Sequence, residues 1–402
     1  MSSHSKILKH ASLCLLLLAA QAHGAALKSA AKLAFDDAGT LYIADWKAAR
    51  VYAVKVPAAA AAPARPFNLR DIGKPIAAAL KLKETTLHFH DLAVQPGTGM
   101  AYVSVTAGGQ AAVVAIDAAG QVRRLATGAL KSFIAIVDPP ASGEAFWRDL
   151  PAPALTVTDL KVHDAKLYLA GLSNRNFAST LRVFDLPFNG KGRAATVEMY
   201  HPVHNQVETR APIRAMSFAT IDGVPSMVAA YTCTPLVLIP LHAIEDGAHI
   251  VAKTIGEMGW GSAPVGMVSY KLGDMEMVLL ANSSRAADLM SVSDIAAQAR
   301  LPGLRDPVSV PDKPYAGIRG TMAPMSALMR VDNLDDKLLL AMRRDDTSGA
   351  MQLVTIPKGA YLRLSDFVNE YDFRDYAYPA ADKFHEYHKY WRTIEGYPEL
   401  VR

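Results

Sequence analysis

The sequence predicts an all-β protein built from repeated small antiparallel sheets, and three observations support this fold class. Apolar runs of about five residues alternate with turns that contain Asp and Gly, as in short antiparallel strands. The same order of strand, tight turn, strand, polar corner and strand recurs six times. Successive repeats begin roughly 50 to 70 residues apart, within the range of large structural repeats.

The first repeat, residues 33–56, defines the pattern. It reads LAFDDAGTLYIADWKAARVYAVKV, with a turn at Asp36–Gly39 and a polar corner at Asp45–Lys47. Units with the same order of features lie at residues 91–116, 159–184, 213–239, 265–292 and 325–356.

Four short strands per unit, repeated around an axis, predict a β-propeller of six or seven blades. Closure into a ring leaves few exposed strand edges. Fourth strands are expected in linking segments such as 121–125 and 195–199, and a seventh unit would come from 65–82 or from the segment after Lys358. The alternative is a pair of β-sandwiches, which would not predict the same order six times.

Residues 1–25 have the form of a secretory signal. Lys6 and Lys9 precede the apolar run 11–20, and small residues follow it. The chain is therefore expected to be periplasmic or secreted, without a membrane span in the mature chain. Removal of the signal leaves Cys233 as the one cysteine, which excludes an internal disulfide. A small buried side chain explains Cys233 better than a nucleophile does.

After the propeller, expected over residues 26–360, comes an aromatic C-terminal extension at 361–402. It contains 11 of the chain's 31 aromatic residues. Phe384, Tyr387, His388 and Trp391 fall at helical spacing and predict a short helix. We expect the extension to pack on the propeller; the alternative is a helix that docks a partner. Ala58–Ala62, flanked by prolines, is expected to be a loop outside the blades.

Charge and motifs exclude several function classes. The formal net charge is +4, from 42 basic and 38 acidic residues, without the dense basic clusters that nucleic-acid binding requires. The sequence contains no GxSxG, GxxxxGK[ST] or CxxCH motif, and no GxGxxG follows a strand. No catalytic residue is assigned.

Residues 33–56 resemble a repeat of the NHL and SMP-30/gluconolactonase-like propellers, in which a phrase such as DAGTLYIAD lies between the first two strands of a blade. The resemblance implies that ligands bind where the corners between strands two and three meet the loops that enter strand one. Residues of these segments, rich in Arg, Asn and His, are the candidate ligand-binding residues: Trp46, His88, His90, Asp91, Asp159, Asn174, Arg175, Arg214, Trp260, Asn282, Arg285 and Arg343. Arginine and amide groups suit an anionic or hydroxylated small ligand. The alternative is that these are ordinary solvated corners.

A divalent metal is a further candidate cofactor. His88 and His90 would project to the same side of an extended strand, where two imidazoles bind such an ion. His201 and His204 would supply further ligands if the ring brings them near. The alternative is a pair of ordinary strand-edge histidines. The methionines at 275–277 and 322–329 fit strand packing better than copper binding.

The resemblance also implies a specific metal site in the lactonase-type enzymes, made of a Glu from the first blade with an Asn and an Asp from later blades. Asn174, Asn282 and Asp159 are available, but residues 25–33 contain no carboxylate. The sequence therefore favours an exported, non-catalytic propeller that binds a small ligand or a partner protein. The alternative is a metal-dependent hydrolase of the lactonase kind. A third class, a periplasmic accessory to a redox enzyme, rests on compartment and on Trp46 and Trp260.

Overall fold

A computed structural model describes residues 26–57, 65–127, 130, 132–259, 261–309 and 312–359. The predicted signal, the Ala58–Ala62 loop, Trp260 and the C-terminal extension with its helix lie outside these residues and stay predictions.

Each of the six predicted units contains the three strands expected of it. In chain order these strands are β1 (Lys32–Phe35), β2 (Thr40–Asp45), β3 (Arg50–Lys55), β5 (Leu87–Gln95), β6 (Met100–Ala107), β7 (Gln110–Ile116), β12 (Asp159–His163), β13 (Lys166–Leu172), β14 (Ser179–Asp185), β17 (Ile213–Ile221), β18 (Val224–Tyr231), β19 (Pro235–Pro240), β21 (Pro264–Leu272), β22 (Met275–Asn282), β23 (Ala287–Ser291), β26 (Leu328–Asn333), β27 (Leu338–Arg344) and β28 (Met351–Pro357).

The other elements complete or flank these sheets. They are the strands β4 (Asn68–Leu69), β8 (Val122–Arg124), β9 (Phe133–Ala135), β10 (Ala145–Trp147), β11 (Leu150–Pro151), β15 (Arg193–His201), β16 (Gln206–Glu208), β20 (His249–Glu257), β24 (Ala316–Gly317) and β25 (Thr321–Ala323), the helices α1 (Gly73–Leu80) and α2 (Val292–Arg300), and the 3₁₀ turns η1 (Glu84–Thr86), η2 (Ala152–Leu155) and η3 (Leu241–Ala243). The strands β8 and β15 confirm the two predicted fourth strands. Among the residues described, no helix is both long and apolar enough to cross a bilayer.

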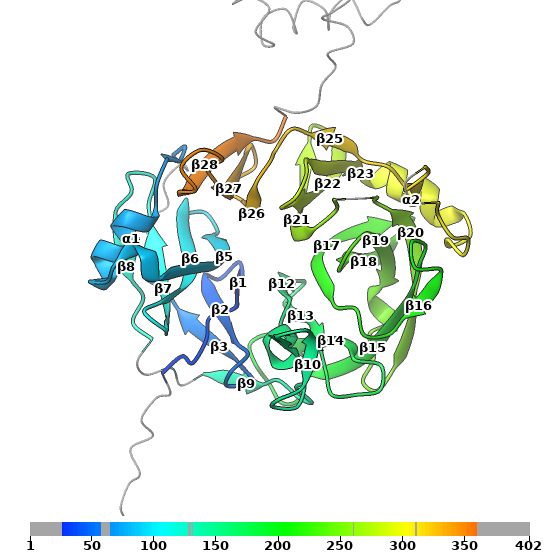
Figure 1. Ribbon diagram of the computed structural model, residues 1–402, viewed down its shortest axis with the longest axis horizontal. Coiled ribbons are helices and arrows are strands. Elements are labelled where there is room, and N and C mark those ends of the chain that lie inside the picture. The colour runs from blue at the N-terminus through cyan, green and yellow to red at the C-terminus, as the bar shows by residue number, and fades with distance from the viewer. Residues whose placement is uncertain are drawn as a thin grey trace, which may run out of the picture.

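The sheets form a propeller-like arrangement around a central axis (Figure 1). Counted as separate sheets, the described residues give four four-stranded blades rather than the predicted six or seven: β1-β2-β3-β9, β5-β6-β7-β8, β21-β22-β23-β25 and β26-β27-β28-β4. The strands β12–β15 and β17–β20 belong to one ten-stranded sheet. It consists of two four-stranded antiparallel runs joined by parallel pairing of β15 with β20. The small sheet β10-β11 stands apart.

Residues 65–82, considered for a seventh unit, do not form a further blade. They contain the two-residue strand β4 and the helix α1. The reason is local: alanines follow Pro75, and alanine is the strongest helix former while proline is tolerated in a first helical turn.

The order of the sheets around the axis differs from their order in the chain. The sheet β5–β8 lies between the sheet of β26–β28 and the sheet of β1–β3, because the inner strand β5 packs against both β26 and β1 (Figure 1). After β3 the chain adds β4 to the last sheet, builds β5–β8, and then returns to add β9 to the first sheet. The ring is therefore closed by two outer strands that are distant in sequence from their sheets.

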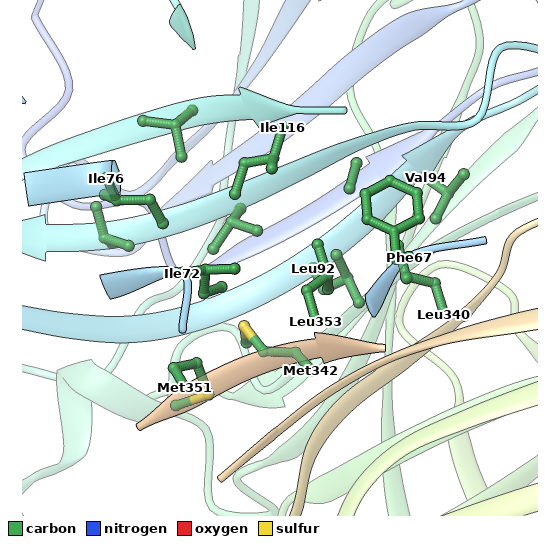
Figure 2. Close-up of a cluster of buried hydrophobic side chains, with 14 of the residues drawn as sticks. Phe67, Ile72, Ile76, Leu92, Val94, Ile116, Leu340, Met342, Met351 and Leu353 are labelled. Carbon is green, nitrogen blue, oxygen red and sulfur yellow. The ribbon is translucent and has the colours of Figure 1, made fainter. Parts of the chain in front are cut away.

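A cluster of buried apolar side chains holds this closure together (Figure 2). Leu92 and Val94 from β5 meet Leu353 from β28, and Phe67 and Ile72 from the segment around β4 complete the contact. Burial of one such side chain stabilises the fold by about 1.5–3 kcal/mol.

Buried or half-buried aspartates on the inner strands connect neighbouring sheets. A carboxylate oxygen of each accepts a hydrogen bond from a backbone N–H of the next inner strand: Asp91 from Leu33, Asp159 from Met216 and Asp332 from Val94, each at 2.8 Å. These bonds fix the inner strands around the axis and position the site described next.

Candidate ligand-binding site

Two cavities meet near the axis. The larger, here called the central cavity, has a volume of about 900 Å³ and is lined by residues of all six inner strands, β1, β5, β12, β17, β21 and β26. The smaller, here called the corner pocket, has a volume of about 370 Å³ and includes the predicted residues Trp46, His90 and Arg214. Lys32 and Arg330 line both cavities.

Five charged side chains, here called the charged cluster, lie where the cavities meet: Lys32, Asp91, Asp159, Arg214 and Arg330. Arg330 Nε donates to Asp91 Oδ1 at 2.7 Å, and Lys32 Nζ lies 3.6 Å from the same oxygen. Asp159 accepts hydrogen bonds from two backbone N–H groups, those of Leu160 and Met216. Three cations therefore face two carboxylates, each of which already accepts hydrogen bonds.

Burial and like charge weaken the protonated form of the basic groups. Desolvation, followed by the positive charge of Arg330, lowers the pKa of Lys32 from 10.5 to about 8. The same two causes lower the pKa of Arg214, while Asp159 opposes the shift. The cluster thus holds more positive charge than its carboxylates compensate.

Arg214 is the member of the cluster with unused hydrogen-bonding capacity. It is the second residue of the inner strand β17 and is half-buried in the wall of the corner pocket. No hydrogen bond joins its guanidinium to another described residue, whereas Arg330 donates to Asp91 and to the carbonyl of Val265. A guanidinium carries five N–H donors in a planar fork that matches a carboxylate or phosphate.

Part of the lining of the corner pocket is apolar. Phe89, Leu155 and Val157 line it together with Trp46, which follows β2. The preceding residue, Asp45, is fully buried and accepts four hydrogen bonds, so it fixes the corner and takes no part in the pocket lining.

A β-bulge separates the two histidines that were expected to lie on one side of a strand. In the β5–β6 pairing Phe89 opposes Val105 and Asp91 opposes Ser104, so His90 is the extra residue. His90 lines the corner pocket and its Nε2 lies 2.7 Å from Thr106 Oγ1, whereas His88 lines a different groove. Burial, Arg330 and His88 lower the pKa of His90.

The bulge also bears on the predicted metal pair. Among the described residues, the group of three close metal-ligating side chains is His201, His204 and Glu208, and it includes neither His88 nor His90. Metal binding by His88 and His90 stays a prediction.

Four of the remaining predicted residues make contacts within the protein. Arg175 pairs with Asp138 at 2.8 Å on the surface, and the backbone N–H of the adjacent Asn174 donates to the carbonyl of Asp138. Asn282 is fully buried and holds the corner before β23 through four hydrogen bonds. Arg343 donates to Gln352 at 3.1 Å.

Arg285 lines a separate pocket of about 230 Å³ and pairs with Asp288 at 2.6 Å. Cys233 is exposed, so its expected burial is wrong. Partial desolvation and the charges of Glu257 and Glu208 raise the pKa of its thiol, which does not favour a nucleophile.

Of the twelve predicted residues, the structure therefore brings Trp46, His90, Asp91, Asp159 and Arg214 to the two cavities. Sequence reasoning missed Lys32 and Arg330. Lys32 begins the otherwise apolar strand KLAF, and Arg330 lies between apolar residues in LMRVDN. A cation beside apolar strand residues was the signal available in the sequence.

The residues at the axis do not fit the divalent ion that the family resemblance implies. Lys32 occupies the entry to the first inner strand, where that site would require a carboxylate, and Arg214 and Arg330 add positive charge nearby. The side chain of Asn282 is already hydrogen-bonded to the backbone of Ala263 and Ala286. Three cations beside two carboxylates repel a divalent cation.

Comparisons with known proteins add no family. No known protein family matches the chain, and no curated protein matches it in sequence. Solved structures with some similarity include a chain of the mitotic checkpoint complex, at 7% identity and a TM-score of 0.33, over 89% of this chain and 98% of that one. A luciferin-regenerating enzyme is 10% identical, with a TM-score of 0.31 over 82% of this chain and 91% of that one. The PQQ-bound aldose sugar dehydrogenase of Streptomyces coelicolor is 12% identical, with a TM-score of 0.31 over 83% of this chain and 95% of that one. These values carry no argument about function.

Proposed function

We propose that the protein binds a small organic anion in the corner pocket, with the anionic group on Arg214 and the apolar part against Trp46 and Phe89. The observation that carries the proposal is the half-buried Arg214 guanidinium, which has no acceptor among the described residues and faces a pocket. A guanidinium fork that lines a cavity without an acceptor among the described residues can bind a carboxylate or phosphate supplied by a ligand.

The charge balance supports an anion rather than a neutral ligand. Asp91 and Asp159 already accept hydrogen bonds from the backbone, and Asp91 is also shared by Arg330 and Lys32. A bound carboxylate would offset the surplus positive charge and stabilise the protonated form of Lys32.

The pocket supports a small molecule rather than a protein partner. Its volume of about 370 Å³ lies within the usual range for small-ligand sites, and its apolar wall suits an aromatic or aliphatic group. The cations at the axis also favour binding over the alternative of a metal-dependent hydrolase, because the lactonase chemistry requires a divalent ion where Lys32 lies.

A matched pair of probes tests the proposal. Phenylacetate and phenylacetamide have nearly the same shape and differ in charge. We expect phenylacetate to bind the full chain at pH 7 at least tenfold more tightly than phenylacetamide, measured by isothermal titration calorimetry. Arg214→Gln is expected to abolish this preference. Arg343→Gln is the matched control, since Arg343 lies outside both cavities. Equal affinities for both probes, or an unchanged preference in Arg214→Gln, would contradict the proposal.

We further propose that the chain is exported to the periplasm or secreted, on the strength of residues 1–25. Cell fractionation of the full chain, compared with a Leu16→Arg variant in the apolar run, tests this: the variant should remain inside the cell. We also infer a relation to the NHL and SMP-30-like propellers from DAGTLYIAD. A count of six blades follows if each antiparallel run of the ten-stranded sheet is counted as one blade.

A further inference from the structure

A second cluster of potential ligands lies away from the axis, at the joint between the two runs of the ten-stranded sheet. His201 ends β15, His204 lies in the following turn, and Glu208 ends β16. Their ligand atoms all lie within 4.8 Å of one another. Glu208 Oε1 is 3.5 Å from His201 Nδ1 and 2.6 Å from His204 Nδ1.

We propose that His201, His204 and Glu208 bind one divalent transition-metal ion of the Zn²⁺ class. Two imidazole nitrogens and one carboxylate oxygen form a donor set that zinc and similar ions prefer. In a tetrahedral site with metal–ligand distances of about 2.0–2.2 Å, ligand atoms lie roughly 3.3–3.5 Å apart. The existing separations need only small side-chain movements to reach this geometry.

A second, independent observation is a buried carboxylate near His201. Glu257, at the end of β20, is fully buried, and its Oε2 has no hydrogen-bond partner among the described residues. That oxygen is 4.0 Å from His201 Nε2, and Thr234 Oγ1 lies 3.2 Å from the same nitrogen. A carboxylate near the remote nitrogen of a histidine is a usual outer partner of a metal-binding imidazole. The Thr234 hydroxyl lies within hydrogen-bonding distance of the same nitrogen and orients the ring.

The exposure of the cluster is compatible with metal uptake. The His201 side chain is 2% exposed and that of His204 is 45% exposed. A metal ion therefore enters from the side of His204.

A metal bound at this cluster would stabilise the joint between the two antiparallel runs of the ten-stranded sheet. His201 and Glu257 end the two strands, β15 and β20, whose parallel pairing joins the two antiparallel runs. The metal would fix the β15–β16 hairpin at this joint. Zn²⁺ should accordingly raise the unfolding temperature of the protein.

The test uses the full chain without an affinity tag, Zn²⁺ alone as the probe, and metal analysis after dialysis at pH 7.5. We expect the wild type to hold one equivalent of Zn²⁺ more than His204→Ala or Glu208→Gln. His242→Ala, an exposed histidine outside the cluster, serves as the control and should match the wild type. His204 is partly exposed, so its truncation is compatible with folding, which the unfolding temperature without metal verifies.

Two further measurements separate a metal site from a simple His204–Glu208 ion pair. Co²⁺ should give visible d–d absorption with the wild type that is absent in His204→Ala. Thr234→Val should weaken Zn²⁺ affinity by about tenfold to a hundredfold, the usual effect of losing an outer partner. Equal Zn²⁺ content and equal Co²⁺ spectra in wild type and His204→Ala would overturn the proposal.

Discussion

Replacement of Lys32 by Met is expected to stabilise the protein at neutral pH. Lys32 is 7% exposed, and its pKa is about 8 in the folded chain against 10.5 in the unfolded chain. One pKa unit corresponds to about 1.4 kcal/mol, so the charged ammonium costs about 3 kcal/mol in the folded state. Met retains most of the apolar stem and removes the charge.

The stability difference between Lys32→Met and the wild type is expected to depend on pH. Between pH 8 and 10.5 the unfolded chain still holds the Lys32 proton that the folded chain has lost, so this group makes stability rise with pH. The gain in the free energy of unfolding from Lys32→Met should be largest below pH 8 and should disappear as the pH approaches 10.5. Titrating groups that do not interact with Lys32 affect both proteins alike and cancel in the difference.

Urea unfolding of wild type and variant at pH 7 and pH 10 measures this difference. Lys55→Met, at the exposed end of β3, is the matched control and should change stability by less than about 0.5 kcal/mol at either pH. A less stable Lys32→Met at pH 7, or a difference that does not vary with pH, would refute the interpretation of the charged cluster.

Three further substitutions test the fold. Asp45→Ala should lower the free energy of unfolding by about 3–5 kcal/mol, because one buried and two partly buried backbone N–H groups and the buried Ser29 hydroxyl lose their acceptor. Asp45→Asn should cost less, and equal urea midpoints for the two variants would contradict this. Gly171→Ala should cost about 1–3 kcal/mol, since a Cβ would collide with the carbonyl of Thr156, and an unchanged melting temperature would show that β13 can move away. Leu353→Ala should cost about 2–5 kcal/mol by opening a cavity between two sheets, and a loss under 1 kcal/mol in urea unfolding would argue against the observed ring order.

Local structure was largely predictable from the sequence. Residues 33–56 and 213–239 each form three antiparallel strands, because period-two apolar runs and Asp or Gly turns act over a few residues. The order of the sheets was not predictable, since the pairing of β4 with β28 and of β9 with β3 depends on contacts distant in sequence.

The site was predictable in part for the same reason. Trp46 and Arg214 stand at strand ends where a propeller gathers its ligands, so their position followed from the repeat. The separation of His88 from His90 depends on a bulge, which alternation in sequence does not reveal. Lys32 and Arg330 were missed because their roles arise from each other's charge across the axis.

The most direct test of the account is the number of protons taken up when phenylacetate binds. Calorimetry at pH 8 in two buffers of different ionisation enthalpy gives this number. Because the folded pKa of Lys32 is about 8, roughly half of the molecules lack its proton there, and a bound anion should restore it. We predict uptake of a few tenths of a proton by the wild type and none by Lys32→Met. Binding without proton uptake in the wild type would contradict an anion site beside Lys32.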